Sequence, residues 1–595
     1  MHGPGATSVR SVFALTFTVL LSTTVFTPAP AGAAAPTVKD GIATPTACAA
    51  LGFDMRRADE DGSAGGGLLN NRAVKLAPSP MPIKPLVAAP TGVVPPGDAM
   101  TEAVAPPSPP AAGIVAAQPM ETEKYPDATP NPIKSVAEAP VSTFSTDVDT
   151  ASYANVRRFI NDGTLPPRDA VRVEELVNYF DYGYARPATP DVPFSTTVSL
   201  TPSPWQTGKE IIHIGLQGYD IPRTAEPPLN LVFLVDVSGS MDEPDKLPLA
   251  QKALNVLIDR LRPEDRVSLA VYAGAAGAVL PPTSGVEKLK IRCAVDALQA
   301  GGSTAGGEGL ALAYAMAEQN FDKKAVNRVI LMTDGDFNVG VADPEKLEDF
   351  VAEKRKTGIY LSVYGYGRGN YNDTMMQTLS QSGNGTAAYV DSLQEARKLF
   401  RDDFEGSLFP IADDVKILVE FNPARVAEYR LIGYETRLLN REDFNNDRVD
   451  AGEVGAGTAV TALYEITPVG AKLSSDPLRY QPVKVSTGGD PGGEVAFLKI
   501  RYKLPGEATS KLIERPITDA DRPATLAEAP ESTRFALAVA GYGQLLRGDP
   551  YLGADFTWDS VLKLAEGARG ADPFGLRAEF VQLVRAAETA RSLNE

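Results

Sequence analysis

The sequence predicts an α/β fold whose central part is a doubly wound, mostly parallel sheet. Three observations between about residues 229 and 406 lead to this prediction. Apolar runs without polar alternation recur there, as expected of strands that are buried on both faces. Stretches with helical periodicity separate these runs, and such alternation places helices on both faces of a parallel sheet. Polar residues follow several of the apolar runs, at the sheet edge where ligands bind in such folds.

The elements of this central part follow one another along the chain as strands and helices. Strands are predicted at 231–236, 266–272, 328–333, 359–364 and 386–390, with a short edge strand at 278–280. Helices are predicted at 247–261, 286–298, 309–318, 344–356, 374–380 and 393–404. Apolar residues recur in these helical segments at the spacing that is typical of helices covering a sheet.

The segments on both sides of the central part are predicted to form smaller α+β regions. Ahead of it, we expect helices at 153–161 and 171–180, and the stretch 194–216 alternates as strands do. Behind it, strands are expected at 415–421, 458–465, 483–486 and 495–502, and helices at 535–546 and 576–590. The tract 34–140 is rich in proline, alanine and glycine, which predicts a disordered, semi-extended tether.

The first 33 residues have the features of a secretory signal peptide. Arg10 is the only charged side chain before a short apolar stretch from Val12 to Phe26. Ala31-Gly32-Ala33 then offers a cleavage site of small residues. We therefore expect an exported protein, periplasmic or extracellular, with no transmembrane span in the mature chain. An uncleaved N-terminal membrane anchor is the alternative.

The composition excludes several classes of function. The chain has 57 Lys and Arg against 75 Asp and Glu, a net charge of −18, so it lacks the basic character that nucleic-acid binding requires. Histidine occurs only as His2 and His213, which excludes histidine-based zinc sites and Ser-His-Asp triads. His213 lies in a predicted strand and is expected to be structural. Cys48 and Cys293 are not expected to form a disulfide, because Cys48 lies in the tract that is predicted to be disordered.

One set of polar residues carries most of the functional information. Asp236, Ser238 and Ser240 directly follow an apolar strand and present a carboxylate and two hydroxyls from alternate positions of a turn. Thr304 lies in a glycine-rich loop before a helix, and Asp334 ends another apolar strand. Because the carboxyl ends of parallel strands share one sheet edge, we expect these five side chains to converge there. Oxygen donors of this kind suit a hard divalent cation such as Mg²⁺.

This set resembles the metal-ion-dependent adhesion site (MIDAS) of the von Willebrand factor type A (vWA) family. All five positions of the family pattern are present in order: Asp236, Ser238, Ser240, Thr304 and Asp334. The resemblance implies a Rossmann-like vWA domain over 229–406 that binds Mg²⁺, or another divalent cation such as Mn²⁺ or Ca²⁺. It also implies that an Asp or Glu of a protein partner completes the coordination of the ion. The alternative is a vWA fold with a vestigial site, in which Asp and Ser act as ordinary turn residues.

The flanking segments resemble parts of one bacterial vWA family. The stretch from Thr143 to Tyr153 and the helices after it are similar to an N-terminal von Willebrand extension, placed at 141–228. The segments 429–435 and 442–447 are similar to a C-terminal domain of unknown function, placed at 407–595. These flanking domains carry no motif with an interpretable chemistry.

A weaker motif follows in the C-terminal region. Asp443, Asn445 and Asp447 match the first ligand positions of an EF-hand calcium loop. Arg448 replaces the glycine at the turn, however, and Val454 stands where the bidentate glutamate belongs. We predict a polar hairpin turn, with an irregular Ca²⁺ site as the alternative.

Together these observations predict a secreted, non-enzymatic protein that binds an acidic residue of a protein partner through its metal site. No positioned base, nucleophile or oxyanion-stabilising group is evident, so catalysis by Asp334 and Asp336 beside a metal-bound water is the weakest alternative. A second alternative is a non-catalytic subunit of an ATPase-coupled or envelope assembly complex. The predicted signal peptide argues against an intracellular complex of that kind. The sequence makes no prediction of the partner's identity or of the oligomeric state.

Overall fold

The computed structural model describes residues 43–55, 123–127, 129–146, 148–302, 306–335, 344–476 and 493–594. The predicted signal peptide, most of the predicted tether, the strand predicted at 483–486 and Thr304 lie outside the described residues. Within the described ranges, none of the helices combines the length and the apolar character that crossing a membrane requires.

The central sheet confirms the predicted fold class. Its six strands have the order β10-β9-β8-β5-β6-β7, and every neighbouring pair is parallel except the edge pair β6 and β7. Strand order reverses beside β5, the first strand of the segment, which is where ligand sites lie in doubly wound sheets. The strands are β5 (Leu229–Asp236), β6 (Arg266–Tyr272), β7 (Ala276–Ser284), β8 (Val326–Thr333), β9 (Ile359–Tyr366) and β10 (Ala387–Val390).

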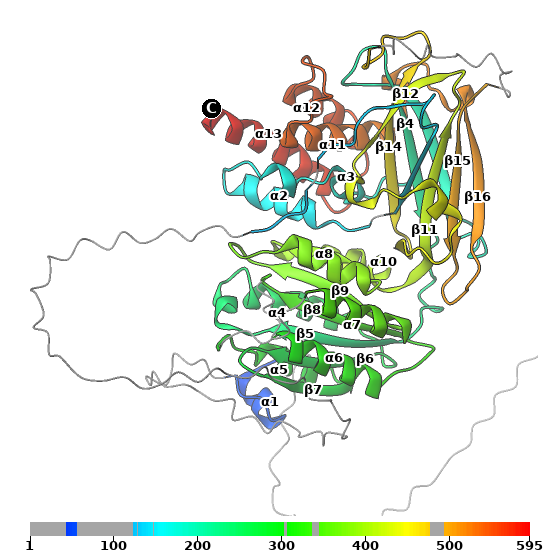
Figure 1. The fold of residues 1–595 in the computed structure, drawn as a ribbon. Coiled ribbons are helices and arrows are strands. Elements are labelled where there is room, and N and C mark those ends of the chain that lie inside the picture. The colour runs from blue at the N-terminus through cyan, green and yellow to red at the C-terminus, as the bar shows by residue number, and fades with distance from the viewer. Residues whose placement is uncertain are drawn as a thin grey trace, which may run out of the picture. The chain divides into compact units, whose positions relative to one another are not determined.

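Helices cover both faces of this sheet, as Figure 1 shows in green. One face packs against α4 (Leu247–Ile258), α5 (Lys288–Asp296) and α9 (Leu393–Arg397). The other packs against α6 (Gly306–Gln319), α7 (Pro344–Lys356) and α8 (Asp373–Ser382). The helix predicted at 393–404 is interrupted, because a π-helical turn over Lys398–Asp402 separates α9 from α10 (Phe404–Leu408). This turn places the Lys398 ammonium 4.4 Å from the centre of the Tyr179 ring.

The remaining strands form two five-stranded antiparallel sheets. The first has the order β1-β12-β14-β4-β3, and the second has the order β13-β11-β15-β16 with β2 paired to β11. The strands before the vWA segment are β1 (Lys134–Ser135), β2 (Val141–Ser145), β3 (Phe194–Pro202) and β4 (Glu210–Gly218). The strands after it are β11 (Pro410–Phe421), β12 (Val426–Ile432), β13 (Gly452–Gly455), β14 (Ala459–Pro468), β15 (Glu494–Lys503) and β16 (Lys511–Thr518). Both flanking segments therefore contribute strands to both sheets.

Aromatic residues join the two sheets into a sandwich. Phe194 of β3 meets Tyr502 of β15 edge to face, with ring centroids 5.5 Å apart. Phe421 of β11 contacts Tyr464 of β14 in the same manner at 5.3 Å. The outer face of the first sheet is covered by a layer of helices, which packs on Ile211 of β4 and its neighbours (Figure 1). These helices are α2 (Ala151–Asn161), α3 (Val173–Asn178), α11 (Glu531–Arg547), α12 (Trp558–Glu566) and α13 (Leu576–Asn594).

The prediction that Cys48 and Cys293 stay unpaired is wrong. The two sulfurs are 2.01 Å apart and form a disulfide that joins α1 (Pro45–Ala50) to α5 of the vWA domain. Helix α1 lies inside the tract 34–140, whose composition predicts disorder. Thr44 starts it by accepting a hydrogen bond from the Ala47 amide, and Pro45 occupies the first turn, where proline is tolerated. The cap at Thr44 and the disulfide to Cys293 together stabilise a helix in a tract whose composition predicts disorder.

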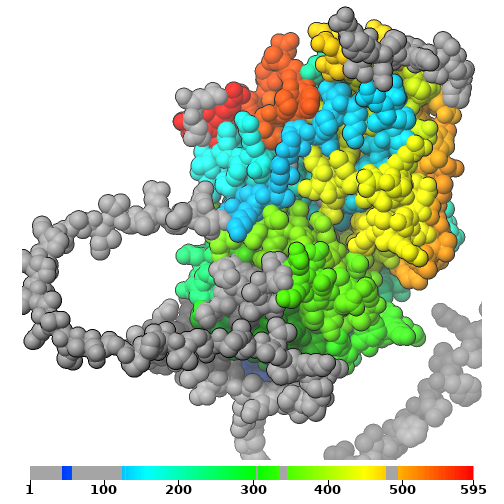
Figure 2. All heavy atoms as spheres, in the orientation of Figure 1, coloured from blue at the N-terminus to red at the C-terminus, as the bar shows by residue number. Residues whose placement is uncertain are grey.

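The end of the same tract is also ordered, which corrects the predicted tether there too. Residues Glu123–Tyr125, which we call the strap, run beside the loop 369–373 of the vWA domain. Figure 2 shows the segment that begins here, in blue to cyan, lying against the green vWA domain. The Lys124 amide donates to the Tyr371 carbonyl, and the Asp373 amide donates to the Lys124 carbonyl, both at 2.9 Å. Glu123 accepts hydrogen bonds from both terminal nitrogens of Arg158 in α2, at 2.7 and 2.8 Å. The strap therefore links the vWA domain to the helical layer.

Candidate metal site of the vWA domain

The first part of the site is the turn that follows β5. Strand β5 is buried along its whole length and ends at Asp236, whose side chain has no exposed surface. The Ser238 amide donates to Asp236 Oδ1 at 2.8 Å, which fixes the carboxylate against the turn. Thr333, the last residue of the neighbouring strand β8, lies with its hydroxyl 3.4 Å from Asp236 Oδ2. The carboxylate is thus held at the carboxyl edge of the sheet, as predicted.

The two predicted serines lie close together on this turn. Their hydroxyl oxygens are 3.0 Å apart, and Ser240 is exposed while Ser238 is buried. The Gly239 amide donates to the Gly302 carbonyl at 3.1 Å, so the glycine-rich loop lies against the turn. Thr304, the predicted ligand of that loop, lies outside the described residues, and its role stays a prediction.

Asp334 belongs to the same edge, because it directly follows β8. Gly335 after it has a φ of +100°, and a Cβ added there would lie 2.7 Å from the Tyr371 Cα atom. Glycine is therefore required for the chain to turn sharply beside the loop 369–373. The Lys246 ammonium donates to Asp334 Oδ2 at 3.0 Å, and this lysine is only 6% exposed. The sequence interpretation did not include Lys246 in the site.

The two carboxyl groups have opposite pKa shifts. Burial raises the pKa of Asp236 to about 6, and the charge of Asp334 adds to the rise, while hydrogen bonds from Ser238 oppose it. Burial also acts to raise the pKa of Asp334. The charge of Lys246 and hydrogen bonds from Asn370, Lys246 and Ser240 outweigh this effect, so that the pKa of Asp334 is lowered. Asp334 is thus stabilised as a carboxylate, whereas burial makes the charged form of Asp236 less favourable.

The donor set fits a hard divalent cation. The described residues Asp236, Ser238, Ser240 and Asp334 offer oxygen donors only, and such donors suit Mg²⁺, Mn²⁺ or Ca²⁺. A cation bound at this edge would favour the charged form of Asp236. Within the described ranges, no three acidic, histidine or cysteine side chains are arranged to hold a metal ion. An ion at this edge would therefore need the serine hydroxyls as ligands as well.

The acidic residues that match the start of a calcium loop accept hydrogen bonds within the protein. Asp443 accepts hydrogen bonds from the backbone and side chain of Asn440, in a capping box at the start of a short 3₁₀ helix. Asp447 Oδ1 accepts a hydrogen bond from Arg501 at 3.0 Å. These carboxylates stabilise a turn against β15, as the interpretation of a polar turn predicts.

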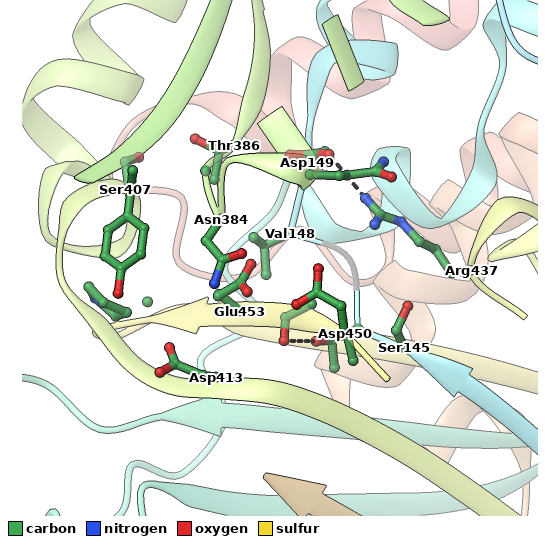
Figure 3. A pocket seen from close by; sticks show the side chains of 18 of the residues that line it. Ser145, Val148, Asp149, Asn384, Thr386, Ser407, Asp413, Arg437, Asp450 and Glu453 are labelled. Atoms are coloured by element: carbon green, nitrogen blue, oxygen red, sulfur yellow. Dashed lines mark hydrogen bonds and ion pairs between the residues drawn. The ribbon is translucent and has the colours of Figure 1, made fainter. Parts of the chain in front are cut away.

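A cavity of about 240 Å³ lies at the other edge of the vWA sheet, where this domain faces the sandwich (Figure 3). It is lined by Arg328 near the start of β8 and by four acidic residues, of which Asp149 pairs with Arg437 at 3.2 Å. Burial, together with the charge of Asp414, raises the pKa of Asp413 to about 6. The cavity therefore makes this interface polar and acidic, and it contains none of the metal-site residues.

Three family models match consecutive stretches of the chain. The model of the von Willebrand factor type A domain matches residues 230–402, and one described as von Willebrand factor matches residues 119–213. A third, described as the C-terminal part of the uncharacterized protein YfbK, matches residues 406–590. The fold and these matches define a vWA domain protein.

One relative shows to which family of vWA domain proteins the chain belongs. The uncharacterized protein YfbK of Escherichia coli (strain K12) is 45% identical over 480 residues, which cover 80% of this chain and 82% of that protein. The chain belongs to the YfbK family of vWA domain proteins. Human inter-alpha-trypsin inhibitor heavy chain H3 is 28% identical over 256 residues, 40% of this chain and 28% of its own length. A solved von Willebrand factor type A structure from Catenulispora acidiphila is 16% identical, covers 68% of this chain and 91% of its own, and has a TM-score of 0.38.

Proposed function

We propose that this protein is an exported, non-enzymatic binding protein whose vWA site holds a divalent cation and captures an Asp or Glu of a protein partner. The cation is Mg²⁺, or another hard ion such as Mn²⁺ or Ca²⁺. The observation that supports this most is the convergence of Asp236, Ser238, Ser240 and Asp334 at one sheet edge, with Ser240 exposed. An ion held by so few anionic ligands retains coordination positions and charge for a carboxylate from outside.

The disulfide supports export. Disulfides persist mainly in oxidising compartments, which include the periplasm and the extracellular space. The Cys48–Cys293 bond is fully buried, and it lies outside the metal site, so a structural role accounts for it. The predicted signal peptide agrees with the same compartment.

The test is a Mg²⁺ titration by calorimetry on the purified mature chain and on two variants, Asp236→Ala and Asp334→Ala. Each variant removes one of the two anionic ligands, and we expect the affinity for Mg²⁺ to fall about tenfold or more. Asp242→Ala is the matched control, because Asp242 is exposed on the same turn and forms no part of the donor set. Circular dichroism checks that all three variants stay folded.

Partner capture is then tested by pull-down with and without EDTA. We expect retained proteins to be lost with EDTA and with Asp236→Ala, and kept with Asp242→Ala. Unchanged Mg²⁺ binding by Asp236→Ala would overturn the proposed metal site. Metal binding without EDTA-sensitive capture would overturn the proposed role of the ion in partner recognition.

A further inference from the structure

We infer that Lys246 sets the charge of the metal-loaded site, so that it weakens binding of the ion and strengthens capture of the partner's carboxylate. This inference rests on the proposed function, because it assumes that an ion binds at Asp236 and Asp334. It adds a residue that the sequence motif does not contain.

The structure holds Lys246 firmly at this position. Its amide donates to the Glu243 carbonyl at 3.0 Å, and its carbonyl accepts from the Ala250 amide at 2.9 Å in the first turn of α4. Its side chain crosses Gly367, which has a φ of +71° and where an added Cβ would lie 2.3 Å from the lysine Cγ and Cε atoms. Gly367 thus leaves the space that the methylene chain fills. The ammonium is a built part of the site and not a surface group that meets Asp334 by chance.

The formal charges of the site give the reason for the inference. Asp236 and Asp334 carry two negative charges when ionised, and Lys246 cancels one of them. A divalent cation then leaves the site with a net positive charge, which a partner's carboxylate neutralises. Without the lysine, the metal-loaded site would be neutral, and an incoming carboxylate would make it negative. Because Asp236 and Lys246 are nearly inaccessible to water, these charges act through a medium that screens them weakly.

Acidic side chains near the site make the positive charge of Lys246 more important for attracting a partner's carboxylate. Asp242 and Glu243 are exposed on the turn between the serines and Lys246. Asp245 is partly buried and lies 3.6 Å from the exposed Arg368. The carboxylates of Asp242 and Glu243 repel an approaching carboxylate, although water and salt screen them, while Arg368 offsets the charge of Asp245. The Lys246 ammonium opposes that repulsion from inside the site.

The experiment compares the wild-type mature chain with Lys246→Met, which keeps the packing against Gly367 and removes the charge. Mn²⁺ is the metal probe, and its affinity is measured by electron paramagnetic resonance. We expect Lys246→Met to bind Mn²⁺ about tenfold more tightly. Acetate is the carboxylate probe. Its binding is measured as the decrease in the water-proton relaxation rate when acetate displaces water from bound Mn²⁺. We expect acetate to bind the loaded variant more weakly than the loaded wild type.

Lys252→Met is the matched control, because Lys252 is an exposed lysine of the same helix and its removal changes the net charge equally. We expect it to change Mn²⁺ affinity by less than about twofold. If Lys246→Met unfolds, Lys246→Gln replaces it, since glutamine keeps a hydrogen-bond donor for Asp334. A wild type that binds no Mn²⁺ overturns the proposed function itself. A wild type that binds Mn²⁺ as tightly as the folded Lys246 variant overturns only the inference about Lys246.

Discussion

His213 is a polar residue that the fold uses for structure. It lies in β4 with no exposed surface and is the only histidine of the described residues. Its Nε2 atom is 2.8 Å from the Tyr184 hydroxyl, and its Nδ1 atom is 3.2 Å from the Thr533 hydroxyl of α11. Burial lowers the pKa of His213 to about 3, so the ring is neutral at ordinary pH. It thus joins the first sheet to the helical layer.

We expect His213→Gln to make stability less dependent on pH. In the unfolded chain, His213 gains a proton below about pH 6.5, whereas the folded ring stays neutral down to a pKa of about 3. The contribution of His213 to the free energy of unfolding is therefore complete above about pH 6.5. It is lost as the pH falls below that value, by about 1.4 kcal/mol per pH unit. Urea unfolding at pH 7 and pH 5 should show a loss about 2 kcal/mol larger in the wild type than in the variant. Equal losses would show that the buried ring is not held neutral.

At the scale of elements, the strap connects the helical layer to the metal edge. It pairs with the loop 369–373, and the Gly369 amide donates to Glu123 at 3.0 Å. The same loop lies against Gly335, next to Asp334. Arg172 of the N-terminal extension adds a second link, because its guanidinium donates to Asp373 at 2.6 Å in a fully buried pair. The extension therefore supports the loop that borders the metal site.

We expect Glu123→Ala to lower the free energy of unfolding by about 3 kcal/mol, because it leaves the buried guanidinium of Arg158 without its carboxylate. The loop 369–373 should loosen as well, and its amides should exchange hydrogen faster. Urea unfolding and hydrogen exchange followed by mass spectrometry measure the two effects. Glu138→Ala is the control, since Glu138 is exposed on the segment that follows the strap. An unfolding free energy like that of the control would contradict the structural role of the strap.

Elements with regular buried periodicity could be predicted from sequence. The predicted strand 266–272 and helix 344–356 have the bounds of β6 and α7, because their apolar spacing follows the sheet that they face. Strand β16 was missed, since Pro516 and the charged residues of an edge strand conceal it. The disulfide was missed because Cys48 and Cys293 meet only in the folded molecule.

In the metal site too, the residue that depends on a contact with a distant part of the chain could not be predicted. Asp236, Ser238, Ser240 and Asp334 follow from a motif and from the shared edge of parallel strands, and the structure brings these four together. Lys246 could not be assigned, because one lysine before a helix resembles many exposed lysines. Its burial depends on Gly367, which comes from a distant part of the chain.

At the scale of the whole molecule, the vWA domain is inserted into the sandwich. Its sheet contains only its own strands, whereas both sandwich sheets combine strands from before and after it. The chain enters and leaves the domain beside one turn. There, the Gly457 amide donates to the Tyr219 carbonyl at 2.9 Å, and the Ala456 amide donates to the Phe409 carbonyl at 2.8 Å. The flanking segments thus form one body around the insertion.

We expect residues 229–406 to fold alone and residues 407–594 not to. The first fragment keeps its complete sheet but loses Arg157 and Arg172, the partners of Glu395 and Asp373, so its stability should be reduced. The second lacks β2 and β4, the neighbours of β11 and β14. Co-expression of 123–228 with 407–594 should restore its fold, as measured by circular dichroism and cooperative unfolding. Cooperative unfolding of 407–594 by itself would show that it is an independent domain.

The insertion has a consequence for biogenesis. Strand β4 is synthesised early, yet its partner β14 follows only after the whole vWA domain, as the pairing of Gln217 with Ala459 shows. Until then β4 has one unpaired edge, because β3 covers only the other, and such an edge invites aggregation. Once the vWA domain folds, its adjacent ends bring β4 and β14 together and shorten the loop that their pairing must close. We therefore expect the inserted domain to fold before the surrounding sandwich closes.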